Sequence, residues 1–231
     1  MKAESESPRP PKVSVVIPTY NHAQFLRTAL DSVVAQTLGE WEAIVVNNFS
    51  QDDTVGVVDS YGDPRIRCVN FANHGVIAAS RNFGIRETSA PYVAFLDSDD
   101  LWYPEKLERC VCMLEEGYDM VCHAETWVGP GDRRRDVAYG PEARAAYDSL
   151  LYDGNCISTS AVMVRRELVE EVGGFSEDAS FITAEDYDLW LKLSKKGARI
   201  GFVSEILGEY LIHGGNQSRA ALRNMEAVLS V

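Results

Sequence analysis

The sequence predicts an α/β protein with a single open, mixed and mostly parallel sheet, flanked by helices on both faces. Over roughly the first hundred residues, β-branched apolar runs alternate with segments of helical periodicity, a pattern typical of parallel strands joined by helices. The chain has 231 residues, 45% of them hydrophobic, which is enough for one large core. No internal repeat interrupts the pattern, so one domain is expected.

The first half of the chain contains alternating strands and helices. Strands are predicted at 12–18, 41–46, 66–71 and 92–96, and helices at 25–36, 52–62 and 75–89. Either Asp52 or Asp53 offers a cap for the second of these helices. Ligands bind beyond the carboxyl ends of strands in such sheets. The polar segments that follow three of the strands, 18–21, 47–50 and 97–100, are therefore expected to converge at one edge.

The second half is expected to continue the same sheet and to form the other wall of a cleft. Pro104 suits the first turn of a helix that runs to Glu116. The segment 118–140 reads as a strand, a turn that contains Arg133 to Arg135, and a second strand. A further strand is predicted at 158–164, and an acidic helix at 184–197 is closed by Gly197.

Charge and cysteine content exclude several classes of protein. The 22 Lys and Arg residues face 35 Asp and Glu residues, and the net charge of -13 opposes binding to nucleic acid or to anionic lipid. Five cysteines without CxxC spacing indicate neither a disulfide framework nor a zinc site. Residues 1–12 are charged and rich in Pro, and we expect a disordered tail. No signal peptide or transmembrane segment is predicted, so a cytoplasmic protein is expected, with peripheral membrane contact left open.

The segment "FLDSDD" places three carboxylates directly after a buried strand, at Asp97, Asp99 and Asp100. A solvated turn that caps the next helix is one interpretation. A site for Mg²⁺ or Mn²⁺ is the other, because these cations bind one or two carboxylates together with substrate phosphates. The first strand is followed by "PTYNHAQ", which is neither a GxGxxG motif nor a P-loop, nor the Gly-rich basic loop of a sugar-nucleotide pyrophosphorylase.

Four motifs in order, "VSVVIPTYN", "FLDSDDLWYPEKL", "VGGFSE" and "AEDYDLWLKL", resemble the family-2 glycosyltransferases of the GT-A fold. The resemblance spans residues 13 to 218 and implies a Rossmann-like domain over residues 13–231. Residues 13–103 would form the nucleotide-sugar half and residues 104–231 the acceptor half. It implies an inverting, metal-dependent transferase that uses Mn²⁺ or Mg²⁺. The Gln-x-x-Arg-Trp motif of processive members is missing, which favours transfer of a single sugar.

The resemblance also assigns roles to individual residues. Pro18, Thr19 and Tyr20 would line the nucleotide-base pocket, and Arg81 would recognise an anionic oxygen. Asp97 and Ser98 would contact the ribose or the sugar, while Asp99 or Asp100 would bind the metal and His213 the diphosphate or the metal. In the Glu185-Asp186 pair, Asp186 would be the catalytic base. We expect a sugar nucleotide as donor, and a glycan, glycolipid or small molecule as the hydroxyl-bearing acceptor.

One motif departs from the family pattern. The family has Asp-Asp-Gly-Ser after the second strand, where this chain has "NNFS", with Asn48 at the base-reading position and Ser50 as the Ser. An Asn side chain has a carbonyl acceptor and an NH₂ donor, so it can still form hydrogen bonds with uracil or thymine. These bonds lack the charge assistance that an Asp would give. A UDP- or dTDP-linked hexose or N-acetylhexosamine is the expected donor. The loss of the acidic pair also motivates an alternative, a non-catalytic module that binds nucleotide sugars.

Overall fold

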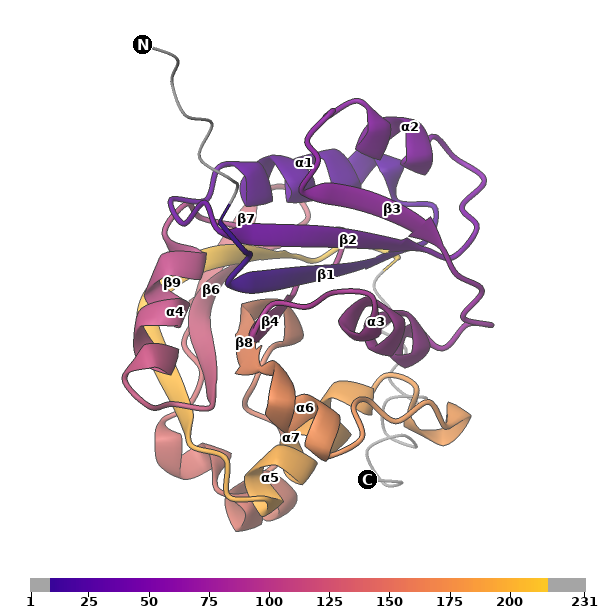
Figure 1. The fold of residues 1–231 in the computed structure, drawn as a ribbon. Coiled ribbons are helices and arrows are strands. Elements are labelled where there is room, and N and C mark those ends of the chain that lie inside the picture. The colour runs from indigo at the N-terminus through magenta and orange to yellow at the C-terminus, as the bar shows by residue number, and fades with distance from the viewer. Residues whose placement is uncertain (1–8, 216–231) are drawn as a thin grey trace.

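The structure, a computed structural model, describes residues 9–215 and consists of one mixed β-sheet with helices on both faces (Figure 1). The predicted α/β class and the single mixed sheet are confirmed. The strands are β1 (Val13–Thr19), β2 (Trp41–Asn47), β3 (Ile66–Asn70), β4 (Tyr92–Phe95), β5 (Leu101–Trp102), β6 (Met120–Gly129), β7 (Arg133–Val137), β8 (Val162–Arg165) and β9 (Ile200–Leu211). The α-helices are α1 (Ala23–Val34), α2 (Thr54–Asp59), α3 (Ile77–Arg86), α4 (Lys106–Glu115), α5 (Tyr147–Asp153), α6 (Arg166–Glu171) and α7 (Glu185–Lys195).

The strand order is β3-β2-β1-β4-β8-β6-β9-β5, and β7 pairs with the outer end of β6. Strands β1 to β4 are parallel to one another, as the alternation of strands and helices predicts. Strand β8 is antiparallel to β4 and β6, β7 is antiparallel to β6, and β9 returns parallel to β6. The carboxyl ends of β1, β2 and β4 therefore lie at one edge, next to the mixed half of the sheet.

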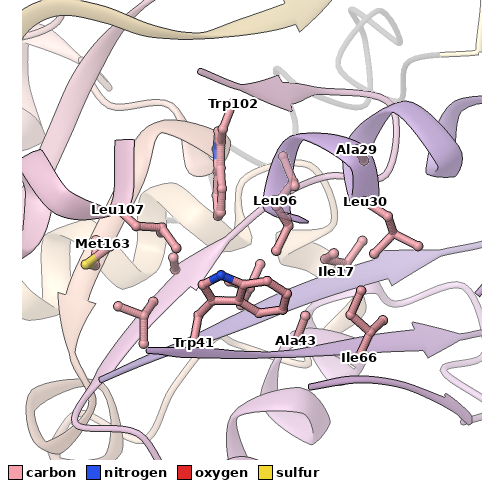
Figure 2. Packing of buried hydrophobic residues seen from close by; sticks show 14 of the residues in the cluster. Ile17, Ala29, Leu30, Trp41, Ala43, Ile66, Leu96, Trp102, Leu107 and Met163 are labelled. Atoms are coloured by element: carbon pink, nitrogen blue, oxygen red, sulfur yellow. The ribbon is translucent and has the colours of Figure 1, made fainter. Parts of the chain in front are cut away.

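Apolar side chains fill both faces of the sheet. Helices α1, α2 and α4 cover one face, where Trp41, Leu96, Leu107 and Met163 belong to a single cluster (Figure 2). Helices α3, α5, α6 and α7 contribute to the cluster on the other face. Helix α1 lies on one face of the sheet and α7 on the other. Residues from both helix layers can therefore reach the edge formed by the carboxyl ends of the strands.

Close packing of α3 on β1 depends on a glycine. A β-carbon at Gly84 would lie 2.5 Å from a methyl group of Val16, which is closer than van der Waals contact allows. The glycine lets α3 approach the sheet closely. This approach brings the middle of α3, where Arg81 lies, under the carboxyl end of β4.

Several boundaries differ from those predicted. Arg133 to Arg135 belong to strand β7 and not to a turn, since the hairpin turns before them. In the strand predicted at 158–164, residues Thr159–Ala161 instead form a 3-10 turn ahead of β8. The long strand β9 was not predicted, nor were α5 and α6. Gly197 follows α7 with a φ of +89°, which confirms its place as the end of that helix.

The ends of the chain lie partly outside the described residues. Residues 1–8 of the predicted disordered tail fall there, but residues 9–12 do not. Arg9 pairs with Glu40 at 3.2 Å, and Lys12 pairs with Glu115 at 2.9 Å. Within residues 9–215, the helices are too short or too polar to cross a bilayer.

A buried lysine generates a prediction about stability. Lys106 is fully buried, with its Nζ 3.7 Å from the centre of the Trp102 ring, and burial lowers its pKa to about 8. We expect Lys106→Met to raise the free energy of unfolding at pH 7 by about 1–2 kcal/mol, because burying an ammonium group costs more than its contacts return. Denaturation with urea measures this change.

The same substitution should alter the pH dependence of stability. Between pH 8 and 10.5 the unfolded chain binds a proton at Lys106 that the folded chain has lost, so stability rises with pH in this window. The rise should be smaller in Lys106→Met. The exposed Lys196→Met serves as control and should change stability by less than about 0.5 kcal/mol. A clear loss of stability in Lys106→Met would contradict the argument.

Candidate functional site

A buried arginine joins two of the predicted motifs. Arg81 on α3 is 3% exposed, and its guanidinium donates to Asp97 at 2.8 Å and to Glu185 at 2.7 Å. Asp97 follows β4, and Glu185 is the first residue of α7. The sequence predicted that Arg81 recognises an anionic oxygen of the donor. In the structure the anions that it recognises are these two carboxylates, because the side chain is enclosed by protein.

The acidic loop after β4 is fixed by Asp100. This side chain is 3% exposed, and it accepts hydrogen bonds from Ser160 Oγ at 2.6 Å and from the Leu211 amide at 2.9 Å. Ser160 Oγ also accepts from the Asp97 amide at 3.1 Å. Burial, then the charges of Asp99, Asp97 and Glu125, raise the pKa of Asp100 well above its usual value. Asp100 therefore anchors the loop, and the geometry favours Asp99 over Asp100 as the carboxylate that a ligand can reach.

Asp99 lies beside His213, with its Oδ2 2.8 Å from Nε2 of the imidazole. The ring of His213 stacks on Phe25 of α1 at a centroid distance of 4.8 Å. Within residues 9–215, His, Cys, Asp and Glu side chains form no preassembled group of three metal ligands. One carboxylate and one imidazole nevertheless fit a cation such as Mn²⁺ or Mg²⁺, which takes its remaining ligands from substrate phosphates and water.

His22 lies beside the acidic loop, although the sequence assigns it no role. It occupies the N-cap position of α1 without a side-chain capping bond, its Nδ1 lies 3.0 Å from Ser98 Oγ, and its ring lies 5.9 Å from that of His213. Ser98 is buried, so its hydroxyl meets His22 and not solvent. The turn between β1 and α1 brings His22 close to the acidic loop. The local sequence "PTYNHAQ" does not predict this proximity.

Asp186 lies in the first turn of α7, and both of its oxygens are engaged. Oδ2 accepts from Thr159 Oγ1 at 2.8 Å, and Oδ1 accepts from the Tyr187 amide at 2.7 Å. Burial, and then the charge of Glu185, raise the pKa of Asp186 to about 6. A carboxylate has about four lone-pair directions, so further acceptor capacity is left for a proton. An aspartate with this pKa is ionised at neutral pH and suits a general base.

Glu185 differs from its neighbour. Its Oε1 pairs with Arg81 and its Oε2 accepts from the Thr183 amide at 2.8 Å, while the whole residue is 6% exposed. Thr183 has a φ of +82°, which is costly for a β-branched residue. The predicted catalytic pair thus divides into Asp186, which retains acceptor capacity, and Glu185, which holds Arg81 and the turn before α7.

The carboxyl ends of β1 and β2 present the predicted nucleotide-binding residues. Pro18 and Thr19 are buried, and Tyr20 is 51% exposed. Among described groups, Thr19 Oγ1 has no hydrogen-bond partner although it is buried. The Asn21 amide donates to Ser50 Oγ at 2.9 Å, so the two loops are tied together.

The "NNFS" loop has an unexpected arrangement. Asn48 Oδ1 accepts a hydrogen bond from the Asn73 amide at 3.1 Å, so the carbonyl expected to read a base N–H already has one partner. Phe49 follows with a φ of +55° and is 59% exposed. A bulky residue in the left-handed region is strained by about 1–3 kcal/mol, and such strain gathers at functional sites.

Thr159 and Ser160 are site residues that the sequence reasoning missed. They lie in one 3-10 turn, from which Thr159 bonds Asp186 and Ser160 bonds the acidic loop. The sequence signal for them is the polar "STS" at the start of the apolar run that predicts a strand. Neighbouring Ser and Thr side chains can form hydrogen bonds with nearby groups, and these bonds compete with the backbone hydrogen bonds of a sheet.

Solved structures resemble this fold over most of its length. The S. aureus TarS structure (residues 1–349, in complex with UDP-GlcNAc) superposes with a TM-score of 0.76 at 24% identity, over 90% of this chain and 61% of that one. Mannosyltransferase PcManGT from Pyrobaculum calidifontis superposes with a TM-score of 0.71 at 19% identity, over 96% and 64%. The fold is therefore that of the GT-A glycosyltransferases.

Sequence comparison gives the family. The model of glycosyl transferase family 2 matches residues 14–173. An uncharacterized glycosyltransferase of Rickettsia typhi is 30% identical over 94% of this chain and 69% of its own length, and TuaG of Bacillus subtilis is 31% identical over 87% and 79%. The chain belongs to glycosyl transferase family 2, and the predicted family is confirmed.

The Arg81 bridge yields a prediction. Arg81→Gln would leave the Asp97 and Glu185 carboxylates close together without a counter-charge, and we expect a loss of about 3–5 kcal/mol in the free energy of unfolding at pH 7. Arg86→Gln, on an exposed position of the same helix, is the control. Equal urea midpoints for the two variants would show that the bridge contributes little.

Proposed function

We propose that this protein is an inverting, metal-dependent, non-processive glycosyltransferase. It would move a hexosyl or N-acetylhexosaminyl group from a UDP- or dTDP-linked donor to an acceptor hydroxyl in glycoconjugate synthesis. The observation that carries the proposal is the Arg81 bridge, which brings the acidic loop and the start of α7 together although 88 positions separate Asp97 from Glu185. TarS is described in complex with UDP-GlcNAc and PcManGT with GDP-Man and Mn²⁺, which supports a sugar-nucleotide donor.

The donor nucleotide would bind across the ends of β1 and β2. The exposed ring of Tyr20 can stack on the base, and the unpartnered Thr19 hydroxyl offers a hydrogen bond at the same edge. Asn48 would turn its NH₂ toward a ring carbonyl, because its own carbonyl already accepts from Asn73. Uracil and thymine both offer such a carbonyl.

Asp99 and His213 are the proposed metal ligands, and Asp97 would contact the ribose or the sugar. A divalent cation bound there would stabilise the charge of the departing diphosphate. Asp100 is left out of this set, because it is 3% exposed and its hydrogen bonds with Ser160 and Leu211 anchor the loop. The net charge of -13 makes such local help necessary for any anionic donor.

Asp186 is the proposed general base. It would accept the proton of the acceptor hydroxyl while the hydroxyl oxygen bonds to the anomeric carbon and the bond to the diphosphate oxygen breaks. Attack opposite to the leaving group inverts the configuration at that carbon. Thr159 and the Tyr187 amide hold the carboxylate in place, so that its orientation is set before the acceptor arrives.

Replacement of the base tests the proposal. We expect Asp186→Asn to lower release of UDP from UDP-GlcNAc or UDP-glucose in the presence of Mn²⁺ by roughly 100-fold or more, the usual contribution of a general base. Asp188→Asn is the control, since Asp188 lies in the same helical turn but pairs with Lys192. Turnover by Asp186→Asn at the wild-type rate would overturn the base assignment. Nucleotide binding by the wild type without any turnover would instead favour a binding module.

The hydroxyl of Thr159 should set the pH profile. Burial, and then the charge of Glu185, raise the pKa of Asp186 to about 6, and the Thr159 hydrogen bond limits this rise because it stabilises the charged form. Thr159→Val should therefore move the acid limb of the rate profile upward by about one pH unit. Activity should fall more at pH 6 than at pH 8, and the exposed Thr37→Val should leave the profile unchanged. An equal loss at every pH would contradict this role.

A further inference from the structure

A row of three side chains crosses the outer strands of the mixed half of the sheet. Trp127 of β6 lies directly opposite Arg135 of β7 on one side and Tyr210 of β9 on the other. Residues opposite one another in neighbouring strands project from the same face. The Trp127 and Tyr210 rings lie 5.5 Å apart between centroids, so they form one continuous aromatic surface.

This row lies on the face of the sheet that carries α7. Trp127 Nε1 donates to Tyr139 Oη at 3.1 Å, and Tyr139 donates to Glu125 at 2.6 Å. Tyr139 packs against the same apolar cluster as the buried face of α7. The pKa of Glu125 is raised to about 7 by burial, with lowering contributions from Tyr139 and then Ser158, the neighbour of Thr159. The row is thus continuous with the turn that holds Asp186.

The arginines of β7 divide between the two faces of the strand. Successive side chains of a strand point to opposite faces, so Arg133 and Arg135 share the face of Trp127. Arg134 points the other way, where Glu209 and Asp132 pair with it. Arg133 and Arg135 are exposed, and within residues 9–215 neither has an ion-pair partner.

We propose that Trp127, Arg133 and Arg135 form an acceptor subsite for a saccharide that carries an anionic group. A sugar ring would pack on the indole of Trp127, and its carboxylate or phosphate would pair with the two guanidinium groups. The proposal rests on the proposed function, for which it supplies the acceptor class. Two exposed arginines without ion-pair partners among residues 9–215, next to a half-buried aromatic surface in a chain of net charge -13, fit an anionic sugar better than a neutral one.

Saturation-transfer NMR on the full chain tests the subsite, with glucuronic acid, glucose 6-phosphate and glucose as probes. The double variant Arg133→Gln/Arg135→Gln should weaken binding of an anionic probe roughly tenfold, because charge-assisted hydrogen bonds are lost. Binding of glucose should change little. Trp127→Ala should weaken all the probes that bind. The two anionic probes distinguish a carboxylate-bearing from a phosphate-bearing acceptor.

The matched control is Arg134→Gln on the same strand, which should bind the probes within twofold of the wild type. Undiminished binding of the anionic probes in the double variant would overturn the subsite, as would absence of all probe binding in the wild type. UDP binding with Mn²⁺ is measured by calorimetry on the same wild-type sample. Its absence would contradict the proposed function, whereas UDP binding with an unaffected double variant contradicts the acceptor subsite alone.

Discussion

The buried guanidinium of Arg81 is the interaction on which the site depends. Burial of a cation costs several kcal/mol unless opposite charges compensate it. Asp97 and Glu185 supply these charges, and they come from opposite halves of the chain. The pKa of Arg81 is raised, because the attraction of the two carboxylates outweighs the cost of burial. If either carboxylate moved away, the buried charge of Arg81 would be only partly compensated, at a large cost in free energy. The acidic loop and α7 are therefore held at one separation.

A second connection explains why the acidic groups of the site differ from one another. The 3-10 turn before β8 directs Thr159 to Asp186 and Ser160 to Asp100. Each aspartate in this region has its own set of donors, and the set decides its chemistry. Asp100 is surrounded and serves as an anchor, whereas Asp99 meets an imidazole at the edge of the sheet. Identity of residue type therefore does not imply identity of role, because burial and hydrogen bonding set the affinity of each carboxylate for a proton or a cation.

The sequence predicted the parallel half of the fold well, since its strands are short apolar runs with both faces buried, as the β1 and β4 segments show. Strand β9 escaped prediction because its twelve residues mix Gly, Ser and Glu with apolar residues, and its pairing with β6 shifts register twice. Motif order indicated the acidic loop and Asp186. It could not show that Arg81 pairs with protein carboxylates, or that Asn48 accepts a hydrogen bond from the Asn73 amide. Both depend on contacts between segments that are distant in the sequence.

The two halves of the sheet impose different constraints on the ligands. At the donor end, several parallel strands deliver their carboxyl ends to one edge, and loops such as the one tied by Asn21 and Ser50 have little freedom to change. The second strand of the β6–β7 hairpin carries exposed side chains, and within residues 9–215 its outer edge pairs with no further strand. Substitutions there cost the fold little, as is general for exposed positions away from buried networks. If the proposed function holds, surface substitution on β7 would alter recognition of the acceptor, while the bridged carboxylates would keep the geometry of the site.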